Sequence, residues 1–88
     1  MKRLFSTGRI LISQMASRHL DMEVISNLLN RHKAGDWGDI TQDDIRANDE
    51  ALRTGARLMS VYVLDDRKWY VITEADRSST TLLLAEEY

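Results

Sequence analysis

The sequence predicts an α+β fold: a small antiparallel sheet of three to four strands with two to three helices on one face, in the order β-α-α-β-β-β. Three apolar runs rich in β-branched and aromatic residues predict strands at Leu58–Leu64, Trp69–Ala75 and Thr80–Ala85. The breaks between them, 65–68 and 76–79, are long enough for hairpins and too short for a helical crossover. The three strands are therefore expected to form an antiparallel meander.

The rest of the chain precedes this meander and is expected to cover it. Leu4–Ile12 predicts a first strand, with Gly8 inside it as a bulge or a bend. At 88 residues, the chain is read as one domain, divided into a strand segment 1–12, a helical part 13–54 and the meander 57–88.

Side chains that cap helix N-termini mark the helical part. Ser13 is a candidate N-cap for a helix at Gln14–Leu20, and Asp21 for a helix at Met22–Lys33, although the two pieces could also be one bent helix. Thr41 begins a capping pattern for a third helix that runs to about Thr54 and ends at Gly55. Its apolar side is thin, so we expect this helix on the rim, with its acids in water.

The predicted core combines one stripe of the second helix with strand residues. Its members are Ile25, Leu28, Leu29, Val61, Val63, Val71, Ile72, Leu82 and Leu84. Trp37 lies between Gly35 and Gly38, which permit sharp turns, so we expect its ring to fold back on the domain.

Composition limits the class of protein. There is no cysteine, no apolar run approaches the length of a membrane span, and the N-terminal sequence does not resemble a signal peptide. We therefore expect a cytoplasmic protein with no membrane association. A chain this short has limited stability unless it pairs with a partner, and a homodimer is left open.

Charge is uneven although the net charge is only −2. Residues 1–33 hold six Lys or Arg against two acids, whereas 36–50 hold six acids against one Arg. This split either orients a partner electrostatically or reflects the preference of helix N-termini for carboxylates.

The sequence announces no catalytic or metal-binding motif. His19 and His32 are too far apart for neighbouring positions on one helix, so both are expected to be structural. No phosphate-binding loop, dinucleotide fingerprint or nucleophile elbow occurs. We expect no catalytic residue, no metal and no cofactor.

Candidate binding residues gather at one hairpin end and at the two tryptophans. Glu74, Asp76 and Arg77 flank the second turn of the meander, where Asp76 should accept amide hydrogen bonds and leave the Arg77 guanidinium free for a partner. Trp37 and Trp69 are the aromatic candidates. Aromatic and basic residues on a sheet can also bind single-stranded nucleic acid, which is less expected because no basic stripe is present.

Several segments resemble the small "plasmid-related" proteins of bacterial plasmids, integrative elements and prophages. The resemblance covers about 1–12 and 29–88 and rests on Gly35-Asp36-Trp37-Gly38-Asp39, Thr73-Glu74-Ala75-Asp76-Arg77-Ser78, Thr80-Thr81 and Glu86-Glu87-Tyr88. Members tend to have Pro where Ala85 stands and Gly in the first hairpin turn, and 14–27 is unlike them. The resemblance implies an accessory protein of a mobile element and no particular activity.

Two functions fit these observations. The first is a cytoplasmic protein-interaction or regulatory module, without enzymatic activity, that binds and modulates a host or defence protein. The alternative is a nucleic-acid binder or a small toxin-like ribonuclease that uses Glu74, Asp76, Arg77 and His32.

Overall fold

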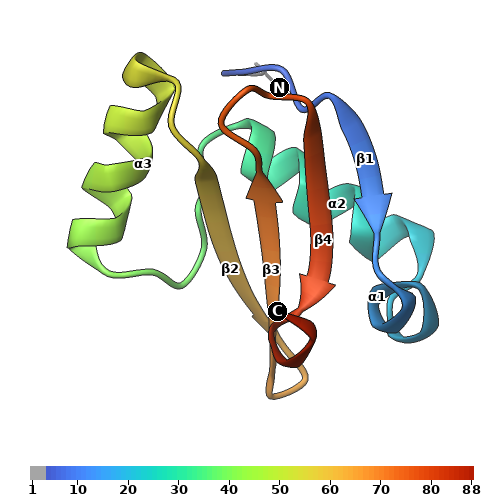
Figure 1. Cartoon of the computed structure of the whole chain (residues 1–88). Coiled ribbons are helices and arrows are strands. Elements are labelled where there is room, and N and C mark those ends of the chain that lie inside the picture. Colours follow the sequence, from blue (N-terminus) through green and yellow to red (C-terminus); the bar gives the residue numbers. More distant parts are fainter. Residues whose placement is uncertain (1–3) are drawn as a thin grey trace.

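The computed structural model describes residues 4–88 and contains one sheet and three α-helices (Figure 1). Along the chain the elements are β1 (Arg9–Ile12), α1 (Gln14–His19), α2 (Met22–Lys33), α3 (Gln42–Thr54), β2 (Leu58–Leu64), β3 (Arg67–Thr73), β4 (Ser79–Leu84) and the 3-10 turn η1 (Ala85–Glu87). The predicted α+β fold is confirmed, and the helical part consists of separate helices.

The sheet has the strand order β1-β4-β3-β2 and is mixed. The strands β2, β3 and β4 form the predicted antiparallel meander. The first strand instead runs parallel to β4, because the chain between them crosses over through the helices. The first hairpin turn is shorter than predicted: Asp65 and Asp66 have φ values of 51° and 63°, as a two-residue type I′ turn requires, so β3 begins at Arg67.

The first strand is also shorter than predicted. It begins at Arg9, and Gly8 precedes it with φ 61°. A Cβ atom on Gly8 would lie 2.3 Å from the carbonyl oxygen of Ser78, so the close approach of this corner to β4 needs glycine. Residues 1–3 of the predicted strand segment lie outside the described residues.

The three predicted N-caps are present. The side chains of Ser13, Asp21 and Thr41 each accept a hydrogen bond from the backbone N–H three residues later. The cap at Asp21 begins a new helix after the extended backbone of Leu20, which separates α1 from α2.

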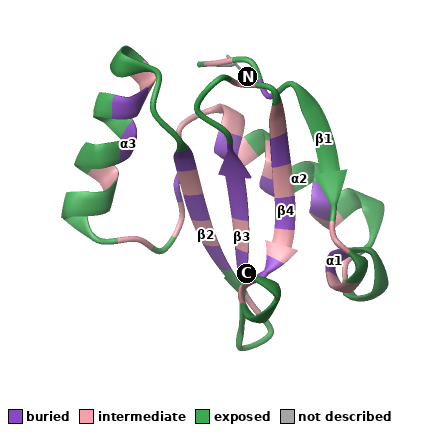
Figure 2. Cartoon of the chain, in the orientation of Figure 1, coloured by how far each residue is buried: buried purple, intermediate pink, exposed green. Residues whose placement is uncertain are grey.

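Helices α1 and α2 cover one face of the sheet, whereas α3 lies beside β2 (Figure 1). The main core lies between this covered face and the two helices, and β4 alternates between buried and half-buried residues (Figure 2). Its buried members are Ala16, Ile25, Leu28, Tyr62, Trp69, Val71, Leu82 and Leu84.

Part of the predicted core lies on the other sheet face. Val63 was wrongly predicted as buried and is 47% exposed, while Val61 on the same face is half-buried. The reason is that β2 turns Leu58, Ser60 and Tyr62 toward the helices, so its valines alternate onto the open face. Leu29, on α2, is also half-buried but packs against the main core.

A second, smaller core joins α3 to the sheet. Trp37, Ala51 and Leu58 are its buried members. Trp37 is only 4% exposed, as predicted, and the acidic side of α3 lies in solvent.

We expect Leu28→Ala to lower the free energy of unfolding by about 2–5 kcal/mol, because it removes a fully buried side chain from the interface of α2 with the sheet. Met22→Ala on the same helix is the control: Met22 is 75% exposed, so the change should stay within about 0.5 kcal/mol. Urea unfolding measures both. Equal effects would contradict the packing of α2 on the sheet.

Candidate functional site

A chain of buried hydrogen bonds crosses the sheet beneath α2. His32 Nδ1 lies 2.6 Å from Ser60 Oγ, and His32 Nε2 lies 2.9 Å from Thr73 Oγ1. Thr73 Oγ1 in turn lies 2.7 Å from Thr80 Oγ1, which donates to the carbonyl oxygen of Thr7 at 2.8 Å. The histidine and the three strand hydroxyls are inaccessible to solvent. One imidazole thereby connects α2 to β2, β3 and β4.

The acceptor at the end of this series determines the direction of three hydrogen bonds, those of Thr80 with Thr7, of Thr73 with Thr80 and of His32 with Thr73. A carbonyl oxygen only accepts, so Thr80 uses its proton on Thr7 and must accept from Thr73. Thr73 therefore accepts from His32, whose proton is on Nε2. The unprotonated Nδ1 accepts the proton of Ser60. All groups are satisfied when the imidazole is neutral.

Burial favours this neutral form. Desolvation, with a smaller contribution from the positive charge of Arg77, lowers the pKa of His32 from 6.5 to about 4.

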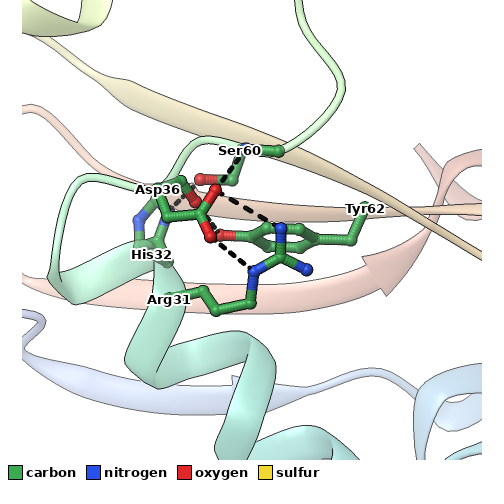
Figure 3. Close-up of polar contacts among 6 residues, drawn as sticks. Arg31, His32, Asp36, Ser60 and Tyr62 are labelled. Atoms are coloured by element: carbon green, nitrogen blue, oxygen red, sulfur yellow. Dashed lines mark hydrogen bonds and ion pairs between the residues drawn. The ribbon is translucent and has the colours of Figure 1, made fainter.

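Ser60 and His32 have the hydrogen bond of a nucleophile with its base, and both are labelled in Figure 3. Neither has exposed surface, so no substrate can reach the hydroxyl and the pair is structural in this conformation.

An ion pair lies at the surface near these buried hydrogen bonds (Figure 3). Arg31 Nε donates to Asp36 Oδ2 at 2.7 Å, and the guanidinium carbon lies 4.5 Å from the centre of the Tyr62 ring. Hydrogen bonding to Arg31 lowers the pKa of Asp36. The Tyr62 hydroxyl donates to the carbonyl oxygen of Asp36, and Asp36 also accepts from the amide of Gly38. These contacts hold the 35–39 loop on the sheet.

The same loop requires glycine at one position. Gly38 has φ 79°, and a Cβ atom there would lie 2.0 Å from the carbonyl oxygen of Val61.

The Trp37 ring packs edge-on against His32 at a centroid distance of 5.6 Å and stacks on Phe5 at 6.3 Å. Trp37 and Trp69, two of the predicted binding residues, are thus in the cores, and their rings are not on the surface.

The predicted site at the second hairpin end is only partly as expected. Asp76 accepts from the amide of Ser78 at 3.0 Å, as predicted for its turn, and hydrogen bonds from Ser78 lower the pKa of Asp76. Glu74 is exposed. The prediction of a free Arg77 guanidinium is wrong: it donates to the carbonyl oxygens of Ala51, Ala56, Glu74 and Ala75.

These hydrogen bonds make Arg77 a connection between the hairpin and the end of α3. The bond to Ala51, at 3.0 Å, is made to a carbonyl oxygen in the last turn of that helix that also accepts the amide of Gly55. With His32 buried and the Arg77 donors engaged, neither residue is presented to a substrate, so the residues considered for a ribonuclease do not form an accessible site.

A different part of the surface carries one of several open hollows. A hollow of about 330 Å³ lies between the start of α3 and the open face of β2 and β3. Half-buried Ile40, Val61 and Tyr70 contribute its apolar surface, exposed Asp39 and Asp44 contribute two negative charges, and exposed Lys68 contributes one positive charge. A smaller hollow of about 230 Å³ adjoins it and shares Ile40, Asp44 and Val61 with it. None of these residues belongs to the predicted binding set of Glu74, Asp76, Arg77, Trp37 and Trp69, although Asp39 and Asp44 lie in the acidic segment 36–50 noted in the sequence.

The sequence contained an indication of the buried hydrogen bonds around His32 that was not used. Ser60 is the only polar residue of β2, Thr73 ends the apolar part of β3, Thr80 begins the run that leads into Leu82–Leu84, and His32 follows the apolar stripe of α2. Which hydroxyls meet the imidazole depends on strand register, and a single sequence does not specify register. Within residues 4–88, no cluster of three or more potential ligands suits a metal ion, and no helix is long and apolar enough to cross a membrane.

Comparisons with known proteins add no family to this description. No protein-family model matches the chain, and searches of curated proteins and of solved structures found no significant match.

The buried imidazole makes stability depend on pH. Because the pKa of His32 is lower in the folded chain than its ordinary 6.5, the unfolded chain binds the proton more tightly between pH 6.5 and 4. The free energy of unfolding is therefore highest above pH 6.5, and we expect it to fall by about 3 kcal/mol through His32 by pH 4. Nitrogen NMR of His32 should show the Nε2–H tautomer at pH 7 and at pH 5. An imidazolium at pH 6 would contradict the lowered pKa of His32.

The four carbonyl acceptors predict the effect of changing Arg77. Arg77→Ala should lower the free energy of unfolding by about 2 kcal/mol, since hydrogen bonds to a charged donor are lost. Arg77→Lys should recover only part of this loss, because an ammonium group does not reproduce the planar fork. Arg67→Ala, an exposed change at the other hairpin end, is the control in chemical unfolding. If Arg77→Ala left the free energy of unfolding unchanged, these hydrogen bonds would contribute nothing to stability.

Proposed function

We propose that this chain is a small protein-interaction module that binds a basic, apolar segment of another protein in the hollow beside α3. The supporting observation is the combination of Ile40, Val61 and Tyr70 with Asp39 and Asp44 around one concave surface. Apolar area supplies affinity for a partner, while carboxylates at the rim favour a partner with lysine or arginine and speed its approach.

The surrounding charges support a basic partner. Residues 36–50 carry six acids. Asp36 and Asp43 form ion pairs with Arg31 and Arg46. Among the ion pairs of the described residues, none includes Asp39 or Asp44, which leaves both carboxylates available to a ligand.

The biological setting we propose is that of an accessory protein of a bacterial mobile element that modulates a host or defence protein from the cytoplasm. Its support is the resemblance of 35–39 and 73–78 to the plasmid-related proteins. The first of these segments precedes the hollow directly, and Asp39 belongs to both.

One observation favours the alternative of nucleic-acid binding. Tyr70 and Tyr88 form an edge-to-face pair with centroids 5.7 Å apart, and the Arg57 guanidinium lies 5.5 Å from the Tyr88 ring. Aromatic and arginine side chains of this kind stack on bases. Asp39 and Asp44, however, outnumber Lys68 around the hollow that contains Tyr70, so its net charge repels phosphates.

The proposal is tested by adding a short synthetic peptide that alternates lysine with leucine to the labelled protein. We expect the NMR signals of Ile40, Val61 and Tyr70 to shift, and the binding to weaken with salt. Asp39→Asn with Asp44→Asn should weaken binding about tenfold, equivalent to about 1.4 kcal/mol.

Asp65→Asn with Asp66→Asn is the matched control, because it removes the same charge from a turn that does not line the hollow and whose positive φ values asparagine tolerates. A peptide alternating glutamate with leucine tests charge, and a single-stranded oligonucleotide tests the alternative. Shifts caused by the oligonucleotide and not by the basic peptide would replace the proposal with its alternative.

A further inference from the structure

The strand β1 is an apolar edge of the sheet. It lies outermost next to β4 (Figure 1), and all four of its residues are exposed (Figure 2). Ile10, Leu11 and Ile12 are 40%, 41% and 36% exposed. Edge strands of monomeric proteins are usually protected by charges, proline or a covering segment, because their unpaired backbone groups and apolar side chains attract another strand. Arg9 is the only charged residue in β1.

The backbone of β1 has free hydrogen-bonding groups at alternate residues. The amide of Arg9 donates to the carbonyl oxygen of Ser78, directly before β4, and the amide of Ser13 donates to that of Leu82 in β4. In a strand successive residues point their backbone groups to opposite sides. The N–H and C=O of Ile10 and Ile12 therefore point away from β4, and no hydrogen bond to another described residue engages them.

The opposite edge of the sheet, β2, is protected by hydrogen bonds from neighbouring segments. The Asn48 side chain donates to the carbonyl oxygen of Met59 and accepts from its amide. The amide of Val61 donates to the carbonyl oxygen of Trp37, and the carbonyl oxygen of Val61 accepts from the amide of Asp39. The β2 edge is thus covered over most of its length, whereas β1 is uncovered.

We propose that the chain forms a symmetric dimer in which β1 pairs antiparallel with β1 of a second copy, so that the two sheets become continuous. A two-fold axis at Leu11 places Ile10 of each copy opposite Ile12 of the other. Both outward-pointing residues then exchange their N–H and C=O groups with the second copy. The two Leu11 side chains meet at the axis, where opposite residues come closest.

Charge supports this register. It places Arg9 opposite Ser13 of the second copy, with both side chains on the same face of the joined sheet. The Ser13 hydroxyl donates to Glu87 Oε1 at 2.7 Å, so a carboxylate lies beside Ser13. Each guanidinium would therefore meet the carboxylate of the other copy, twice per dimer by symmetry. This self-complementarity is why we assign the edge to a second copy rather than to an unrelated strand.

The test begins with the unmodified protein in sedimentation-equilibrium experiments from micromolar to millimolar concentration. We expect a mass of twice 10.2 kDa at the higher concentrations. Ile12→Pro removes an outward amide and no hydrogen bond to β4, so it should yield a folded monomer. Arg9→Glu should raise the dimer dissociation constant about tenfold, because it places like charges together, while Arg9→Lys should not.

The register is tested by a disulfide, which is straightforward because the chain has no cysteine. At the proposed axis the two Leu11 Cα atoms lie about 4.5 Å apart, within reach of a disulfide. Leu11→Cys should therefore become a covalent dimer under oxidised glutathione. Met22→Cys, which is 75% exposed, should react more slowly with a second copy.

A mass of 10.2 kDa at every concentration would overturn the proposal. So would a dimer that Arg9→Glu leaves intact and that Leu11→Cys fails to trap, or equal trapping of Met22→Cys. If Ile12→Pro does not fold, the dissociation constant of Arg9→Glu and the covalent dimer of Leu11→Cys test the proposal in its place. None of these outcomes depends on the hollow beside α3, so the two proposals stand or fall separately.

Discussion

The buried contact between His32 and the strand hydroxyls is the constraint on which the rest of the structure depends. An imidazole without access to solvent needs a partner at each nitrogen, and these partners come from Ser60 on β2 and Thr73 on β3. Meeting both requirements fixes the rotation of α2, the distance of the helix from the sheet and the relative register of two strands. Apolar packing alone would tolerate small shifts of α2 along the sheet, whereas this directional pair of hydrogen bonds does not.

The loop after α2 and helix α3 are positioned by the same end of the helix. Arg31 precedes His32 and binds Asp36, while the Trp37 ring lies against the imidazole. The loop then runs along β2 and leads into α3, which brings Asp39 and Asp44 to the hollow. The candidate binding surface is therefore built on a rigid scaffold although it contains loop residues, as is common for binding surfaces. Its position follows from the buried core and not from local sequence.

Local features of the sequence were sufficient for much of this architecture. The caps at Ser13, Asp21 and Thr41, the meander and the burial of Trp37 were all predicted, because each follows from residues close in sequence. The parallel pairing of β1, the exposure of Val63 and the acceptors of Arg77 were not. Each depends on contacts between distant segments, and both sheet faces carry apolar residues. The hollow beside α3 was missed for the same reason, since α3 and β3 contribute to it together.

The parallel pairing of β1 with β4 also has a consequence for the order of folding. Ile10 pairs with Thr80, and Ser13 binds Glu87. The strand β1 therefore cannot pair until β4 and η1 have been synthesised. Contacts across so much of a chain form late and slow the search for the native state. Until then the apolar β1 segment has no strand on either side. A nascent chain of this protein is therefore exposed to chaperone capture or aggregation at β1 until β4 has been synthesised.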